Sequence, residues 1–92
     1  MDDFTWVGWV AAFCTTLAFV PQVVTILRTG NVEGVSLSTY ALFTLGLSIW
    51  LAYGVILSDL PMILANLIAF LLAFAVLSLT LYQRLSVKKR PY

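Results

Sequence analysis

Residues 60–83, LPMILANLIAFLLAFAVLSLTLYQ, contain no charged side chain. An α-helix rises about 1.5 Å per residue, so this stretch would be about 36 Å long and would cross the roughly 30 Å hydrocarbon core of a bilayer. Two further uncharged stretches of similar length precede it. The sequence therefore predicts an all-α membrane protein with three transmembrane helices, at about residues 4–27, 36–58 and 61–83.

The composition agrees with this prediction and excludes several classes of protein. The 92 residues are 62% hydrophobic and 10% charged, and the mean hydropathy is +1.02, far above that of a soluble domain. The single cysteine excludes an internal disulfide and a cysteine-built metal site, and the absence of histidine excludes histidine-based catalysis. A net charge of +1 offers no basic footprint for nucleic acid. With no nucleophile–base constellation or phosphate-binding loop, we expect no enzyme, no cofactor and no metal.

The charged residues predict the orientation. Arg28 lies in the first loop, and residues 84–92 form a basic tail, so both belong in the cytoplasm by the positive-inside rule. Asp2 and Asp3 place the N-terminus outside, and they stand where a cleaved signal peptide would carry basic residues. We therefore expect the first span to be a mature transmembrane helix, in a single domain that covers residues 1–92.

Three closely packed helices leave no room for an aqueous path inside one chain. Small residues that bring helices together recur along the spans: Ala11, Ala12, Gly46, Ala52, Gly54, Ala65, Ala69 and Ala73. A translocation path should therefore lie between two copies, and a two-fold homodimer is the commonest closed arrangement.

Two polar or aromatic residues are predicted at one depth. Trp50 and Asn66 each lie about eight residues from the outer turn at Ser58 and Asp59, which is roughly 12 Å along either helix. A tryptophan ring packs on the apolar C–H face of a sugar while an amide hydrogen-bonds its hydroxyls. These residues predict a substrate site, although an Asn66 bound to a neighbouring helix and a space-filling Trp50 fit the same positions.

Residues on either side of this level are candidate gates. Tyr53 lies one turn outward of Trp50 and, with Asp59, could close an outer mouth, although Asp59 also suits a helix cap. Tyr40 and Phe43 lie in the first turns of the second span, where bulky rings would narrow an inner mouth or anchor the interface.

A proline and an amide interrupt the first span toward its inner end. Pro21 deprives the Leu17 carbonyl of its helical partner and favours a bend, and Gln22 follows it directly. The pair acts either as a hinge for the inner half of the helix or as a static kink; the residues alone leave both open.

Together these features resemble SemiSWEETs, bacterial sugar transporters of the SWEET and PQ-loop superfamily. The likeness extends from Trp6 to about Tyr82 and includes the segment NVEGVS at residues 31–36. The resemblance implies a parallel homodimer of triple-helix bundles in the bacterial inner membrane, working by alternating access. The implied roles are substrate binding by Trp50 and Asn66, an outer gate at Tyr53 and Asp59, an inner gate at Phe43 and Tyr40, and a hinge at Pro21 and Gln22. Leu57 stands where some members carry an arginine in the outer gate.

The spans also bear on energetics and on alternatives. They contain no charged residue, so the sequence predicts facilitated diffusion of a mono- or disaccharide such as glucose or sucrose without ion coupling. Two alternatives remain: a PQ-loop carrier of amino acids or another small polar solute, and a non-transporting membrane assembly subunit.

Overall fold

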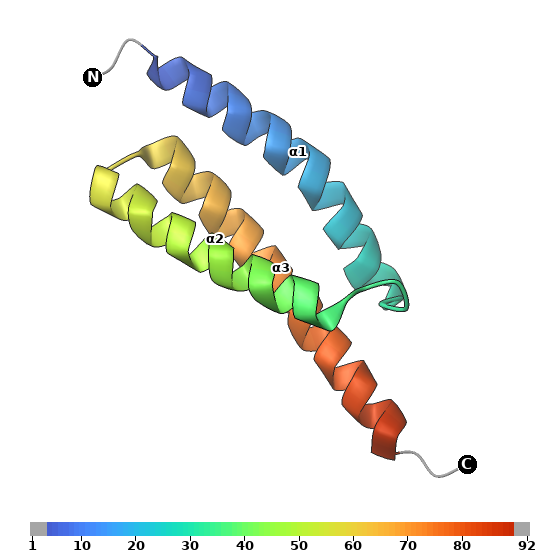
Figure 1. Cartoon of the computed structure of the whole chain (residues 1–92). Helices are drawn as coiled ribbons and strands as arrows, with labels where there is room; N and C mark the ends of the chain where they lie inside the picture. The colour runs from blue at the N-terminus through green and yellow to red at the C-terminus, as the bar shows by residue number, and fades with distance from the viewer. Residues whose placement is uncertain (1–3, 90–92) are drawn as a thin grey trace.

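The computed structural model describes residues 4–89. It contains three helices, α1 (Thr5–Thr29), α2 (Leu37–Leu57) and α3 (Leu60–Lys89), and no strand lies within these residues (Figure 1). Each helix is long and apolar enough to cross a membrane. The predicted all-α fold with three transmembrane helices is therefore confirmed.

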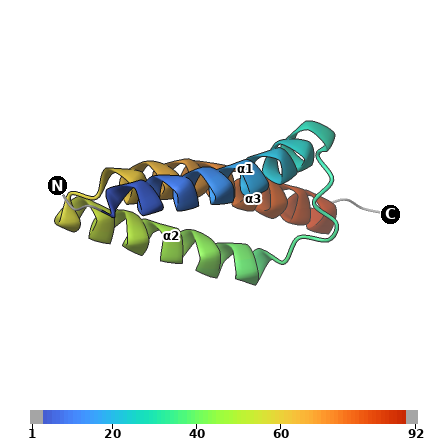
Figure 2. The ribbon, with the colours of Figure 1, turned by 90° about the horizontal axis from the view of Figure 1, so that it is seen from above.

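The spatial order of the helices differs from their order in the chain. Helix α3 packs against both α1 and α2, whereas the α1 and α2 backbones do not approach each other. Figures 1 and 2 show the loop between α1 and α2 passing across the bundle, and the tight turn between α2 and α3 at the opposite end. We call the end with the α1–α2 loop the inner end, after its predicted orientation, and the other the outer end.

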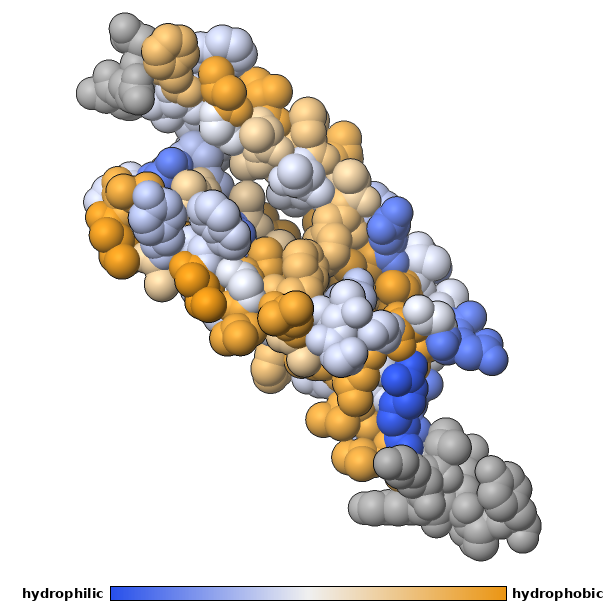
Figure 3. Space-filling view, viewed as in Figure 1, coloured by the Kyte–Doolittle hydropathy of each residue, from blue (hydrophilic) through white to orange (hydrophobic). Residues whose placement is uncertain are grey.

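The protomer is long and flat. Its extents are 61 × 23 × 14 Å. Apolar side chains cover most of the face in Figure 3, and hydrophilic ones gather near the α1–α2 loop. Few of the described side chains are buried within the protomer, so most are open to lipid or to another chain.

The fully buried side chains gather along α3. Ala73, Val76 and Thr80 are buried completely, and Val23 of α1 is 1% exposed. The Thr80 hydroxyl donates to the Val76 carbonyl at 2.7 Å, which satisfies its polar group inside the helix. These positions place the core of the protomer in its inner half, where α3 meets the C-terminal part of α1.

Residues at the inner connection end one helix and begin the next. Gly30 adopts a left-handed conformation with φ of 69°, and its N–H donates to the Ile26 carbonyl to close α1. Ser36 caps α2 by accepting a hydrogen bond from the N–H of Thr39 at 3.3 Å. Ser36 therefore satisfies one of the free N–H groups in the first turn of α2.

The outer connection is a two-residue turn. Ser58 adopts a left-handed conformation with φ of 54° and ends α2. The Asp59 carboxylate accepts a hydrogen bond from the N–H of Met62 at 3.2 Å, so Asp59 caps α3. Pro61 lies in the first turn of α3, where its missing N–H costs little.

Helix α3 is longer than the hydrophobic pattern predicts. It continues to Lys89, past the predicted end at 83, because no glycine or proline interrupts the chain before Pro91. The predicted basic tail at 84–92 therefore begins as helix, and residues 90–92 lie outside the described residues.

Candidate functional site

Asn66 lines an open cavity to which all three helices contribute residues. The cavity has a volume of about 530 Å³, and α1 contributes Thr15, Thr16, Ala18, Phe19 and Gln22, α2 contributes Phe43 and Leu47, and α3 contributes Ala65, Asn66, Ile68 and Ala69. We call it the central cavity. The Asn66 amide nitrogen donates to the Met62 carbonyl of its own helix at 2.8 Å. An asparagine carries a second N–H and an acceptor oxygen, so this side chain retains groups that can bind a hydroxyl.

Trp50 does not line the central cavity. Its ring contacts that of Tyr53 edge-on, with centroids 6.0 Å apart, and the two side chains are 54% and 48% exposed. Within one protomer, the structure therefore brings Trp50 together with Tyr53 but does not bring Trp50 into the cavity of Asn66.

Aromatic rings join α1 to α2 on the inner side of the central cavity. The ring of Phe43 contacts Phe19 at 5.8 Å and Tyr40 at 6.0 Å between centroids, both in edge-on geometry. The two predicted inner-gate residues thus lie side by side. Phe19 was not among the predicted site residues, although its i, i+3 spacing from Gln22 places both on one face of α1.

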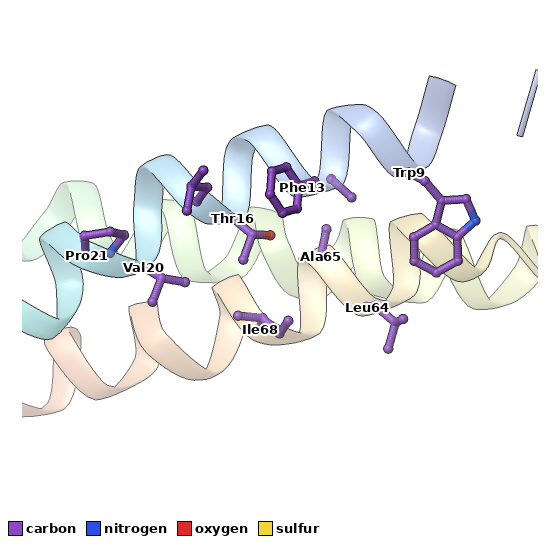
Figure 4. A pocket seen from close by; sticks show the side chains of 10 residues that line it. Trp9, Phe13, Thr16, Val20, Pro21, Leu64, Ala65 and Ile68 are labelled. Carbon is purple, nitrogen blue, oxygen red and sulfur yellow. The ribbon is translucent and has the colours of Figure 1, made fainter. Parts of the chain in front are cut away.

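The proline–glutamine pair faces two separate spaces. Gln22 lines the central cavity, whereas Pro21 lines an apolar groove of about 440 Å³ between α1 and α3. Figure 4 shows this groove, with Trp9 at one end, Phe13 and Thr16 near the middle, and Pro21 at the other end. Helix α1 continues through Pro21. The side chains of Pro21 and Gln22 therefore lie on different faces of α1.

Asp59 and Leu57 lie beside a third space, at the outer end. A cavity of about 930 Å³ separates the start of α1 from the α2–α3 turn, and Asp59, Ser58, Leu57 and Trp9 are among its lining residues. Tyr53 does not line it. The predicted outer pair, Tyr53 and Asp59, is therefore not joined within one protomer, and Asp59 is engaged as the cap of α3.

Comparison with known proteins decides the family. The family model described as PQ loop repeat matches residues 4–63. A protein from Escherichia coli (strain UMEA 3162-1) named "Sugar transporter SemiSWEET" is 43% identical over 91% of this chain and 94% of its own length. The chain belongs to the SemiSWEET family.

Further relatives and solved structures agree with this membership. A SemiSWEET from Bradyrhizobium diazoefficiens is 39% identical over 88% of the chain and 96% of its own length. A structure described as "Crystal structure of SemiSWEET in the inward-open conformation" superposes with a TM-score of 0.90 at 41% identity, covering 96% of this chain and 95% of that one. The resemblance drawn from the residues is confirmed, and SemiSWEET membership makes the chain a member of a transporter family and not an enzyme family.

Proposed function

We propose that this SemiSWEET is a sugar transporter that moves a mono- or disaccharide as a parallel homodimer, by alternating access. The observation that carries the proposal is its similarity, over nearly the whole chain, to proteins named sugar transporters. The proposed orientation has the N-terminus outside and the C-terminus in the cytoplasm of a bacterial inner membrane, as the positive-inside rule predicts.

The polar atoms of Trp50 and Tyr53 support a site between two copies. Among the residues that the structure describes, neither the indole N–H nor the phenol hydroxyl has a hydrogen-bond partner. Unpaired donors at membrane depth are costly, because lipid tails offer no acceptor. A second copy packed against the face that carries Trp50 and Tyr53, with a sugar between the two copies, would supply hydrogen-bond partners for both side chains and shield them from lipid.

Each proposed binding residue contributes a different interaction. The ring of Trp50 packs on the apolar face of the sugar, and the remaining amide groups of Asn66 bind its hydroxyls. Across the two-fold axis the same pair recurs, so a sugar would meet two rings and two amides. The chemistry suits a hydroxylated ring better than a charged amino acid, because residues 4–27, 35–58 and 60–83 contain no charged side chain to pair with it.

The proposed gates lie on either side of this site. The rings of Phe43 and Tyr40, with Phe19 added by the structure, narrow the inner mouth. Tyr53 and Asp59 close the outer mouth across the dimer, without the ion pair that an arginine at position 57 would allow. Because residues 4–27, 35–58 and 60–83 carry no charge, transport is proposed to be facilitated diffusion down the sugar gradient.

Uptake of radiolabelled glucose and sucrose into proteoliposomes tests the function. We expect uptake that saturates with sugar concentration, reaches equilibrium without accumulation, and is unaffected by collapse of proton or sodium gradients. Uptake of a labelled amino acid that neither sugar inhibits, with no uptake of glucose or sucrose, would favour a carrier of other small polar solutes. A non-transporting assembly subunit would move no solute. In that case a thiol reagent should reach Thr16→Cys, in a Cys14→Ser background, from one side of the membrane only.

A Pro21→Ala variant is expected to bind sugar normally and to transport it several-fold more slowly. Alanine restores the N–H that pairs with the Leu17 carbonyl and removes a helix penalty of about 3 kcal/mol, so the straight form of α1 is favoured over the bent form. Turnover by counterflow, and binding by tryptophan fluorescence, measure the two effects separately.

The matched control is Pro61→Ala, because Pro61 lies in a first helical turn where its missing N–H costs little. If Pro21→Ala transports at the wild-type rate, the bend is a static kink and the proposed hinge is wrong.

A further inference from the structure

Two neighbouring side chains of α3 hold the loop between α1 and α2. The Gln83 amide nitrogen donates to the Gly30 carbonyl at 2.7 Å. Arg84 Nη2 donates to the Val35 carbonyl at 2.6 Å and to the Val32 carbonyl at 3.3 Å. These bonds join positions 49 to 53 residues apart in the chain. We call Gln83 and Arg84 the loop clasp.

The loop presents these carbonyls in a fixed arrangement. The Asn31 side chain accepts a hydrogen bond from the N–H of Glu33 at 3.1 Å, and the N–H of Val35 donates to the Val32 carbonyl at 3.0 Å. Val32 itself is buried. Since turns and a buried side chain order the loop, its carbonyls form a ready acceptor site for the guanidinium of Arg84.

Among the described residues, the Arg84 guanidinium binds only the carbonyls of Val32 and Val35. Within the described part of the chain it forms no ion pair, and its side chain is partly buried. A guanidinium can instead bind two carbonyls at once and is not neutralised by deprotonation. These hydrogen bonds connect α3 to the loop between α1 and α2. A cation that served only to orient the protein in the membrane would not need them.

The clasp holds the loop close to the inner end, where the described contact between α1 and α2 is that of the Phe19 and Phe43 rings. The α1 and α2 backbones do not pack against each other, and α2 starts directly after the clasped loop, at Leu37. Tyr40 and Phe43, whose rings meet Phe19 at the inner mouth, follow within two turns. The loop that Gln83 and Arg84 bind therefore connects directly to the inner ends of both α1 and α2.

We propose that Gln83 and Arg84 are positioning residues for the inner mouth. They hold the C-terminus of α1, the loop and the first turns of α2 at one spacing on α3, so that these segments move together during transport. The claim that these segments move together during transport rests on the proposed function. The claim that the clasp sets their spacing does not, and separate experiments measure the spacing and the transport.

Spin-label distances test the spacing without any sugar. In a Cys14→Ser background, labels at Leu27→Cys and Ala41→Cys report on the inner ends, because both positions are exposed. Labelled chains are diluted with unlabelled ones so that only distances within a protomer are seen. In the Gln83→Ala/Arg84→Ala variant we expect this distance distribution to broaden or shift.

A second label pair provides the control for that measurement. Labels at Val10→Cys and Ile56→Cys lie toward the outer ends and are also exposed; their distribution should stay unchanged. An unchanged distribution for the inner pair, or an equal change at both pairs, would overturn the proposal, because the clasp would then position nothing or serve only general stability.

Single substitutions separate geometry from charge. Gln83→Glu keeps the size of the side chain but replaces the donor with a carboxylate, and Arg84→Lys keeps the charge but loses the planar fork. We expect amide hydrogen exchange of residues 30–36 to quicken about tenfold in Arg84→Ala, since a charged hydrogen bond changes an equilibrium by about that factor or more. Arg84→Lys should restore only part of the protection. Full protection in Arg84→Ala would contradict the clasp.

Transport kinetics connect the clasp to the inner mouth. We expect the double variant to lower the maximal rate of sugar uptake several-fold at a nearly unchanged KM, because Trp50 and Asn66 are untouched. A wild-type rate, or a change confined to KM, would overturn the positioning role in transport. If the wild-type protein moved no sugar, the proposed function would fail, while the spin-label distances would still decide whether the clasp sets the spacing.

Discussion

A Gly54→Val variant should lose the packing of α2 against α3 and fail to form a stable bundle. Gly54 is buried, and a Cβ atom at this position would lie 3.1 Å from Met62 Cγ and 3.4 Å from the backbone nitrogen of Ile63. The Met62 side chain can move, and 3.4 Å to the Ile63 nitrogen is an ordinary contact, so a Cβ atom alone leaves the α3 backbone in place with no space to spare. Valine would add two further methyl groups at this contact.

The expected cost is at the upper end for overpacking, about 3 kcal/mol or more. Thermal unfolding in detergent, followed by size-exclusion chromatography of the fraction that remains soluble, measures it. The matched control is Gly46→Val, because the same substitution in the same helix meets no atom within 4 Å at Gly46. Equal stability of the two variants would show that the close approach at Gly54 does not hold the helices together.

The three membrane-spanning helices were predictable because the mean hydropathy of a stretch depends only on the residues within it. A run of apolar residues that can cross a bilayer needs no knowledge of its neighbours, and the three predicted stretches became α1, α2 and α3. Local capping chemistry was predictable for the same reason: Ser36 and Asp59 act within three residues of their own positions. The placement of α3 between the other two helices depends on how their surfaces pack, which no local pattern states.

The candidate site shows the same limit at the level of single side chains. A rise per residue gives the depth of Trp50 and Asn66, but the direction of each side chain depends on the rotation of its helix about its axis. Asn66 faces the central cavity, whereas Trp50 faces outward with Tyr53. The sequence therefore predicts the position of Trp50 and Asn66 along their helices, but it does not predict the direction in which each side chain points.

Interactions between distant segments were the hardest to foresee. Phe19 looks like any apolar residue of the first span until the fold sets its ring against Phe43. Arg84 follows the positive-inside pattern, which explains its presence at the inner end but not its bonds to the carbonyls of the α1–α2 loop. Both contacts exist only because the helices fold back on one another.

Trp50→Ala and Asn66→Ala are each expected to reduce sugar uptake by tenfold or more in proteoliposomes. An aromatic face contributes about 0.5–1.5 kcal/mol beyond its buried area, and a hydrogen bond contributes a similar amount. In a homodimer with sugar on its axis, each substitution removes both copies of the side chain, so the loss is about twice that of one contact. Trp9→Ala is the control, because Trp9 lies on the outer cavity and the α1–α3 groove.

Conservative variants separate the two contributions. Trp50→Phe keeps an aromatic face and should retain more uptake than Trp50→Ala, while Asn66→Leu keeps the approximate size of the side chain and should lose as much as Asn66→Ala. If Asn66→Leu instead keeps much more uptake than Asn66→Ala, the Asn66 side chain fills space and its amide does not bind the sugar.

Mixed dimers test whether one sugar contacts both chains. When wild-type and Asn66→Ala chains are reconstituted together, random pairing gives dimers with a single amide in the site. If the two amides act on one sugar, these dimers should lose about half the binding free energy that the double loss removes, so their affinity lies at the geometric mean of the two parents. Uptake that instead rises in proportion to the fraction of wild-type chains would mean that each protomer binds and transports alone. That result would place the path in the central cavity of one chain and leave Trp50, which faces away from it, without a role in binding.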